Sequence, residues 1–262
     1  MWYGNNEKTM NRDVSLGAPS LKRITLLSEK VDRKDFPFSR FPELLDNEFS
    51  LNFPTSVTFL VGENGTGKST VLEAIAKLCG FHIGGGGSDH QLHQTSDQSQ
   101  SFLAECLRPS WLPKVSKGFF FRSDTFTDVA RYLDDKRIPG ASSAPLHDQS
   151  HGESLLSLFA DRFGTSKRSI YLLDEPENAL SPARQMSFLR LLRDWELSGN
   201  AQMIIATHSP IIMSYPGATI LNFDGDKIKQ VEYEETDHYR VTKAFLGNRE
   251  RYLRELFDDE ES

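Results

Sequence analysis

A glycine-rich segment at residues 62–69, with the sequence Gly-Glu-Asn-Gly-Thr-Gly-Lys-Ser, constrains the fold of this chain more than any other feature. It lies between an apolar run at residues 56–61, which predicts a strand, and residues 68–79, which predict an amphipathic helix. Glycines let the backbone bend so that successive N–H groups face phosphate oxygens, and the helix adds its positive N-terminal end. The flanking strand and helix favour a phosphate-binding loop over a plain glycine-rich turn.

The polar residues of this loop have separate expected roles. The Lys68 ammonium group should reach the β- and γ-phosphates of a nucleotide, and the Ser69 hydroxyl should ligate Mg²⁺. A plain turn would have no need of this pair of residues. The expected nucleotide contacts are Gly62, Glu63, Asn64, Gly65, Thr66, Gly67, Lys68, Ser69 and Thr70.

Two adjacent carboxylates, Asp174 and Glu175, end a second apolar run at residues 169–173. The carboxyl edge of a parallel strand is where such sheets bind ligands. We expect Asp174 to hold Mg²⁺ together with Ser69, and Glu175 to orient or deprotonate the water that attacks the γ-phosphate. The alternative role, capping the helix that follows, is better assigned to Ser181, because Ser181 precedes Pro182 at a preferred first helical position.

His208 follows a third apolar run, at residues 201–206. A lone histidine is more often a core or turn residue than a functional one. At the same sheet edge as the phosphate loop and the two carboxylates, however, its ring can donate a hydrogen bond to the γ-phosphate. We therefore count His208 with Glu175 as the expected catalytic pair.

Residues 149–154 read Gln-Ser-His-Gly-Glu-Ser and open a predicted helix at residues 151–163. Ser150 and Glu153 have the spacing of a capping box, which explains a helix start. The capping box does not explain Gly152, because glycine inside a helix costs about 1 kcal/mol relative to alanine. Gly152 therefore predicts close approach by another group.

Short apolar runs alternate with helical patterns along the chain, which predicts an α/β fold. Nearly continuous apolar strands suit a parallel sheet that is covered on both faces. The expected strands are residues 21–28, 56–61, 118–122, 169–173, 201–206 and 219–223.

Two polar segments interrupt this pattern. Residues 80–101, with four consecutive glycines and many Gln and Ser residues, predict a mobile surface loop. Its three histidines, His82, His90 and His93, are more often solvated in such a setting than bound to metal. Residues 138–150 separate predicted helices at residues 124–134 and 151–163, and the acidic residues 258–262 predict a frayed end.

The charge balance excludes proteins that depend on non-specific phosphate contacts with nucleic acid. Thirty Lys and Arg residues face 37 Asp and Glu residues, a net charge of −7. We expect direct DNA binding to be weak, although a basic run in residues 22–40 could contribute locally.

The apolar residues also argue against membrane insertion or secretion. No apolar run reaches the length of a membrane span, and the first 15 residues lack a secretory signal, so we expect a cytoplasmic protein. Cys79 and Cys106 predict reduced, structural cysteines.

Together these motifs resemble the head of an ABC-type ATPase. Residues 62–69 resemble its Walker A motif, residues 172–175 its Walker B motif and residues 150–153 its signature loop. Residues 180–182 resemble the D-loop, and His208 resembles the switch histidine. The motifs follow the family order across residues 21–233, but Gln149 and His151 stand where the family signature has leucine and its first glycine.

The resemblance implies one domain over residues 1–262, with a P-loop NTPase core, a parallel sheet, an antiparallel N-terminal β portion and a small helical lobe inserted at about residues 81–168. It implies ATP and Mg²⁺ as cofactors and hydrolysis of ATP to ADP and phosphate. It also implies an ATP-dependent homodimer, in which Ser150, Gly152 and Glu153 of one copy contact the nucleotide held by the other.

Two family positions stay open. The adenine-stacking aromatic could be Phe36 or Phe38, and the glutamine of the Q-loop could be Gln91, Gln94, Gln98 or Gln100.

The amino-acid sequences of the motifs are similar to those of stand-alone bacterial ATPases near the RecF, SMC and OLD-type groups. This similarity favours an ATP-driven switch that serves DNA repair or phage defence through a partner effector. The alternatives are the ATP-binding subunit of a transporter and a slow-turnover ATP sensor that binds a protein.

Overall fold

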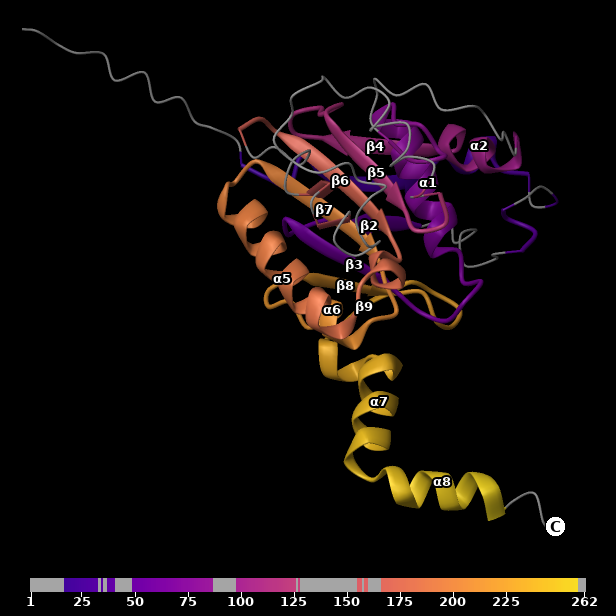
Figure 1. The fold of residues 1–262 in the computed structure, drawn as a ribbon. Helices are drawn as coiled ribbons and strands as arrows, with labels where there is room; N and C mark the ends of the chain where they lie inside the picture. Colours follow the sequence, from indigo (N-terminus) through magenta and orange to yellow (C-terminus); the bar gives the residue numbers. More distant parts are fainter. Residues whose placement is uncertain are drawn as a thin grey trace, which may run out of the picture.

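The computed structural model describes residues 17–32, 34, 37–40, 49–86, 98–125, 127, 155–156, 158–159 and 166–258. In these parts of the chain the strands form two sheets (Figure 1). The smaller sheet is antiparallel, with the order β2-β1-β4. Its strands are β1 (Leu21–Leu26), β2 (Ser50–Asn52) and β4 (Leu107–Trp111). This sheet is the antiparallel N-terminal β portion expected from the sequence.

The larger sheet positions the site and has the order β5-β6-β7-β3-β8-β9. Its first five strands are parallel, and β9 pairs antiparallel with β8. The strands are β3 (Val57–Val61), β5 (Gly118–Arg122), β6 (Ser169–Asp174), β7 (Ala201–Ala206), β8 (Thr219–Asn222) and β9 (Lys229–Val231). The predicted α/β fold with a parallel core sheet is confirmed.

Both faces of the larger sheet are buried. Every residue of β3, β6 and β7 is buried, and successive side chains along β6 enter two different cores. Leu172 packs in the core that contains α1 (Lys68–Cys79), whereas Leu173 packs in the core that contains α5 (Pro182–Leu197). Burial on both faces explains why these strands are continuously apolar rather than alternating.

Helices cover the two faces and extend from one end of the molecule. Figure 1 shows α5 and α6 (Pro210–Met213) on one side of the large sheet, with α1 and α2 (Gln98–Glu105) on the other. The helices α7 (Asp237–Gly247) and α8 (Arg249–Asp258) extend away from both sheets. No residue of α7, which is described over its full length, is buried.

Three short 3-10 helices are described in addition to the α-helices. They are η1 (Ser28–Lys30), η4 (Pro176–Ala179) and η5 (Tyr233–Glu235).

The register of the parallel strands brings three strand ends to one edge. Leu60 of β3 lies beside Ala206 of β7, and Ala206 lies beside Asp174 of β6. The carboxyl edge of such a sheet is where ligands bind. The loop after β3, the carboxylates after β6 and the histidine after β7 therefore meet there, as the sequence predicted.

The prediction of a mobile loop over residues 80–101 is wrong at both ends. Phe81 is only 5% exposed, and Gly86 forms an isolated bridge with Phe120 of β5. At the other end α2 begins at Gln98, because Leu103 and Ala104 supply apolar side chains that pack in the core beside α1. Residues 87–97 lie outside the described part of the chain.

The predicted helical lobe at residues 81–168 needs a boundary correction. Strands β4 and β5 lie inside that range and belong to the two sheets. Most of residues 126–165, including the predicted helix at 124–134 beyond its start, lie outside the described part. Of the helix predicted at residues 151–163, Leu155, Leu158 and Phe159 are described as helical and buried. The rest of the lobe stays a prediction.

Gly118 offers a test of how closely β5 and β6 approach. A Cβ at Gly118 would lie 1.8 Å from the Ile170 carbonyl oxygen, and Gly118 has a φ of +141°. We expect Gly118→Ala to lower the free energy of unfolding by at least about 4 kcal/mol, because the two backbones must separate. The control Gly217→Ala, with a φ of +76° and no atom within 4 Å of the added Cβ, should cost only about 1–2 kcal/mol. Urea unfolding measures both, and equal losses would contradict the close approach.

Candidate active site

The loop between β3 and α1 has the backbone that its glycines predict. Gly62 and Gly67 have φ angles of +139° and +90°, and Gly67 is the N-cap of α1. A Cβ at Gly62 would lie 3.0 Å from Asp224 Oδ1 and 3.2 Å from Thr66 Oγ1. Other residues would strain this turn, so glycine is required by both the angle and the space.

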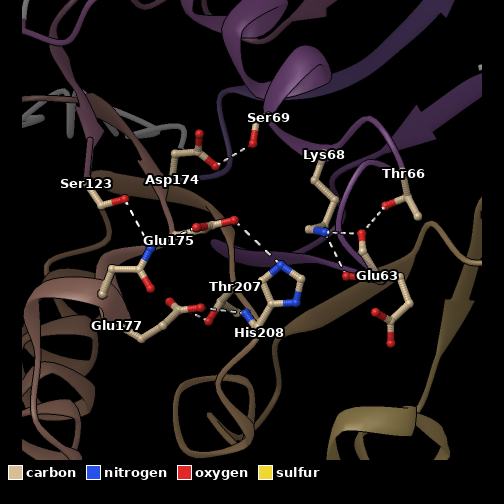
Figure 2. A network of polar contacts seen from close by, with 12 residues as sticks. Glu63, Thr66, Lys68, Ser69, Ser123, Asp174, Glu175, Glu177, Thr207 and His208 are labelled. Carbon is tan, nitrogen blue, oxygen red and sulfur yellow. Dashed lines mark hydrogen bonds and ion pairs between the residues drawn. The ribbon is translucent and has the colours of Figure 1, made fainter. Parts of the chain in front are cut away.

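Lys68 is the central charge of the loop and is only 4% exposed. Its Nζ donates to the carbonyl oxygens of Gly62 at 2.7 Å and Glu63 at 2.8 Å (Figure 2). Burial lowers the pKa of Lys68, and the nearby carboxylates of Glu175 and Asp224 oppose this shift. An ammonium group has three N–H donors, so one remains for an anion beyond the two carbonyls.

A cavity of about 210 Å³ lies against the loop and is lined by residues 64–70, Arg40 and Glu175. The structure thus brings the expected contacts from Asn64 to Thr70 to one open space. Gly62 and Glu63 do not line it, and they act by holding Lys68. Glu63 is itself held, because its backbone N–H donates to Asp224 Oδ1 at 2.7 Å.

Asp174 and Ser69 meet behind this cavity, where Ser69 Oγ donates to Asp174 Oδ1 at 3.0 Å. Burial raises the pKa of Asp174 to about 6, against the opposing effects of the Ser69 hydrogen bond and the Arg122 charge. The two side chains supply the hard oxygen atoms that Mg²⁺ prefers, and Mg²⁺ completes its shell with phosphate and water. Within the described residues, no group of three or more His, Cys, Asp or Glu side chains could hold a metal ion. The two oxygen donors of Ser69 and Asp174 fit Mg²⁺ bound together with phosphate.

A buried ion pair supports Asp174 from the neighbouring strand. Arg122 lies beside Asp174 in the β5–β6 register, and its guanidinium contacts the carboxylates of Glu73 and Asp124. Glu73 is 3% exposed, and burial raises its pKa to about 7 while the Arg122 charge opposes the shift. Sequence reasoning missed this pair. A glutamate on the apolar face of a predicted helix was the signal that could have found it.

Glu175 adopts a strained backbone. Its φ of +49° is the one positive value among described residues other than glycine, and such a conformation costs of order 1–3 kcal/mol. Glu175 Oε2 accepts from the Asn178 side chain at 2.8 Å, while Oε1 faces the ring of His208. Glu175 precedes η4, yet its carboxylate caps no backbone N–H. Ser181 is the N-cap residue of α5, as predicted, although its side chain makes no capping bond.

The loop that carries His208 is held by a third carboxylate. Glu177 accepts from the backbone N–H of His208 at 2.6 Å and from Thr207 Oγ1 at 2.8 Å (Figure 2). Burial raises the pKa of Glu177, and these hydrogen bonds oppose the shift. Burial lowers the pKa of His208, and the charges of Lys68 and His238 add to that effect. The sequence analysis did not predict this role of Glu177. Its position two residues after Glu175 was the only sequence signal that could have indicated it.

The remaining predicted site residues either lie outside the described part of the chain or have other surroundings than predicted. Ser150, Gly152 and Glu153 lie outside the described residues, as does Phe36. Phe38 is not an adenine-stacking residue, because it is only 1% exposed and packs edge-on against Phe102 in the core. Arg40 lines the cavity although its basic run predicted only a solvated face.

The cysteines, the histidines after α1 and the membrane-span search can be compared with the sequence predictions. Cys79 and Cys106 are free and buried, as expected. His90 and His93 lie outside the described residues, and His82 accepts from the backbone N–H of Gly84. Among the described helices, none is both long enough and apolar enough to cross a membrane.

Two protein families match parts of this chain. Residues 119–214 match the family described as "AAA domain, putative AbiEii toxin, Type IV TA system", and residues 38–106 match a family described as "AAA domain". The first match includes β6 and β7, and the second includes β3 and α1.

Similar proteins include ATP-binding proteins of export and import. The cytochrome c biogenesis ATP-binding export protein CcmA of Rhodopseudomonas palustris (strain BisB5) is 32% identical over 163 residues, which are 58% of this chain and 78% of that protein. The molybdate import ATP-binding protein MolC of Haemophilus influenzae is 29% identical over 171 residues, which are 61% of this chain and 66% of MolC. Among solved structures, the SMC head domain from Thermotoga maritima has a TM-score of 0.45 and 15% identity, over 82% of this chain and 100% of that domain.

Proposed function

The chain belongs to the ABC-type ATPases, whose members hydrolyse ATP, and we propose that residues 62–70 bind the phosphates of ATP while Glu175 and His208 act on the terminal phosphate. The observation that carries this proposal is the buried Lys68 ammonium group, held by two carbonyls at the edge of an open cavity. A buried cation is most stable when an anion completes its hydrogen bonds. The phosphates of ATP fit both the charge and the position.

The proposed chemistry needs a base and a hydrogen-bond donor near the terminal phosphate. Glu175 would accept a proton from the attacking water, and its strained backbone and Asn178 contact hold the carboxylate at the cavity. The His208 ring would donate to the γ-phosphate, because its Nε2 is buried and has no hydrogen-bond partner among the described residues. Ser69 and Asp174 would hold Mg²⁺, which offsets the phosphate charge when bound.

We propose that ATP joins two copies of the chain. The support is the resemblance of residues 150–153 to the signature loop, which in ABC-type heads contacts the nucleotide of the opposite copy. Ser150, Gly152 and Glu153 would then face the phosphates held by residues 62–70 of the second copy. The open cavity leaves room for such a contact.

The similar proteins favour one biological role among the alternatives, the ATP-binding subunit of a transporter. CcmA and MolC are by name ATP-binding proteins of export and import, whereas no similar protein reported above supports DNA repair or phage defence. We therefore propose a cytoplasmic ATP-binding subunit that acts on a membrane partner. A slow-turnover sensor remains the second candidate, and very low steady-state hydrolysis would favour it.

Glu175→Gln tests the hydrolytic role and the dimer together. Glutamine has the size of glutamate but cannot take the water's proton, so kcat should fall at least about 100-fold while ATP affinity stays within about threefold. Light scattering should then show a dimer with ATP and Mg²⁺. The control Glu250→Gln, on the exposed surface of α8, should hydrolyse ATP like the unchanged protein. A Glu175→Gln protein that binds ATP but stays monomeric would contradict the proposed dimer.

The same trapped dimer distinguishes a transporter subunit from a DNA-binding switch. With a net charge of −7, we expect its affinity for labelled duplex DNA to be weak, with Kd near about 10⁻⁴ M at physiological salt. Fluorescence anisotropy across a salt series measures this affinity. Nanomolar binding with a steep salt dependence would overturn the transporter proposal in favour of direct action on DNA.

A further inference from the structure

The two ring nitrogens of His208 have different surroundings. Nε2 lies 3.6 Å from Glu175 Oε1 and has no hydrogen-bond partner among the described residues. Nδ1 lies 2.9 Å from Nε2 of His238, and the two rings are 5.1 Å apart between centroids. His238 belongs to the first turn of α7, so it comes from a helix outside the sheet that carries the site. No sequence motif marked it.

The chemistry of these neighbours selects one arrangement of hydrogens. A neutral imidazole has one N–H donor and one acceptor nitrogen, and an ionised carboxylate or phosphate can only accept. Because Nε2 of His208 faces Glu175, the favourable tautomer carries its hydrogen on Nε2. Nδ1 is then an acceptor, and His238 must donate to it through its own Nε2–H. The lowered pKa of His208 agrees with a neutral ring.

The start of α7 is tied to the loop that carries His208. The N-cap Thr236 is only 1% exposed, and its hydroxyl donates to the Tyr233 carbonyl at 2.8 Å. The Tyr233 hydroxyl in turn donates to the Pro210 carbonyl at 2.9 Å, two residues after His208. These bonds hold the first turn of α7 against the His208 loop, so the spacing between the two histidines is set by the fold.

We propose that His238 is a positioning residue, whose Nε2–H holds His208 in the tautomer that presents Nε2–H to Glu175 and to the terminal phosphate of ATP. This inference rests on the proposed role of His208 in hydrolysis. It makes the alignment of His208 depend on the position of α7, a helix with no buried residue of its own. The reactive groups remain Glu175 and His208, and His238 acts only through His208.

The tautomer can be measured directly in the nucleotide-free protein. Two-bond ¹H–¹⁵N spectra of protein labelled at histidine show which ring nitrogen carries the hydrogen, and loss of signals in His208→Ala assigns the ring. We expect the hydrogen of His208 on Nε2 in the unchanged protein. In His238→Phe only Glu175, 3.6 Å from Nε2, still favours that tautomer, so we expect a larger share of the hydrogen on Nδ1 than in the unchanged protein. A hydrogen on Nδ1 in the unchanged protein would overturn the proposal whatever the variants do.

Kinetics separates positioning from simple packing. His238→Phe keeps a ring but removes the donor, so kcat should fall about 10- to 100-fold with KM within about threefold. His238→Gln keeps an N–H donor, so it should retain kcat within about threefold. The control Tyr239→Phe changes the same turn of α7 without touching the histidine pair and should behave like the unchanged protein. Equal kcat in His238→Phe and the unchanged protein would overturn the proposal.

The roles of His208 and His238 can be tested separately. If His208→Ala hydrolyses ATP at the unchanged rate, the role of His208 in the proposed function is wrong, while the ¹⁵N spectra still decide whether His238 sets the tautomer. If His208→Ala is slow but His238→Phe and its tautomer are unchanged, only the role of His238 is wrong.

Discussion

Burial of the Lys68 ammonium group is the interaction on which the rest of the site depends. A charge that is only 4% exposed needs acceptors close by, and the turn supplies two of them from the carbonyls of Gly62 and Glu63. That turn requires glycine at Gly62, and it is braced by Asp224 from the end of β8. In the proposed function, the phosphate of a nucleotide would complete the set of acceptors, so that binding and local folding would use the same ammonium group.

The parallel sheet explains how distant residues reach this cation. Asp174 ends β6, and Glu175 and His208 follow β6 and β7, whose ends lie beside the end of β3. Behind these residues lie further charged groups that hold them in place, including the Arg122–Glu73 pair and the Glu177 carboxylate. The groups at the sheet edge are therefore held by charged side chains from β5, α1 and η4.

The sequence predicted the central strands and α1 because their apolar runs are long and buried on one or both sides. It did not predict β2, β4 or β9, which lie at sheet edges, nor α7, none of whose residues is buried. The residues of the candidate site likewise fall into a predicted group and a group that was not predicted. Residues at strand ends were predicted from their motifs, whereas Arg40 and His238 reach the site only through tertiary packing.

In the proposed function, the buried Lys68 ammonium group binds the phosphates of ATP. Isothermal titration calorimetry of Mg²⁺·ATP into Lys68→Ala measures this contribution, with Lys77→Ala, which changes a half-buried lysine on the same helix α1, as the matched control. We expect at least about 100-fold weaker binding for Lys68→Ala, since a charge-assisted hydrogen bond is lost, and unchanged binding for Lys77→Ala. Equal affinities in the two variants and the unchanged protein would contradict the proposed role of Lys68.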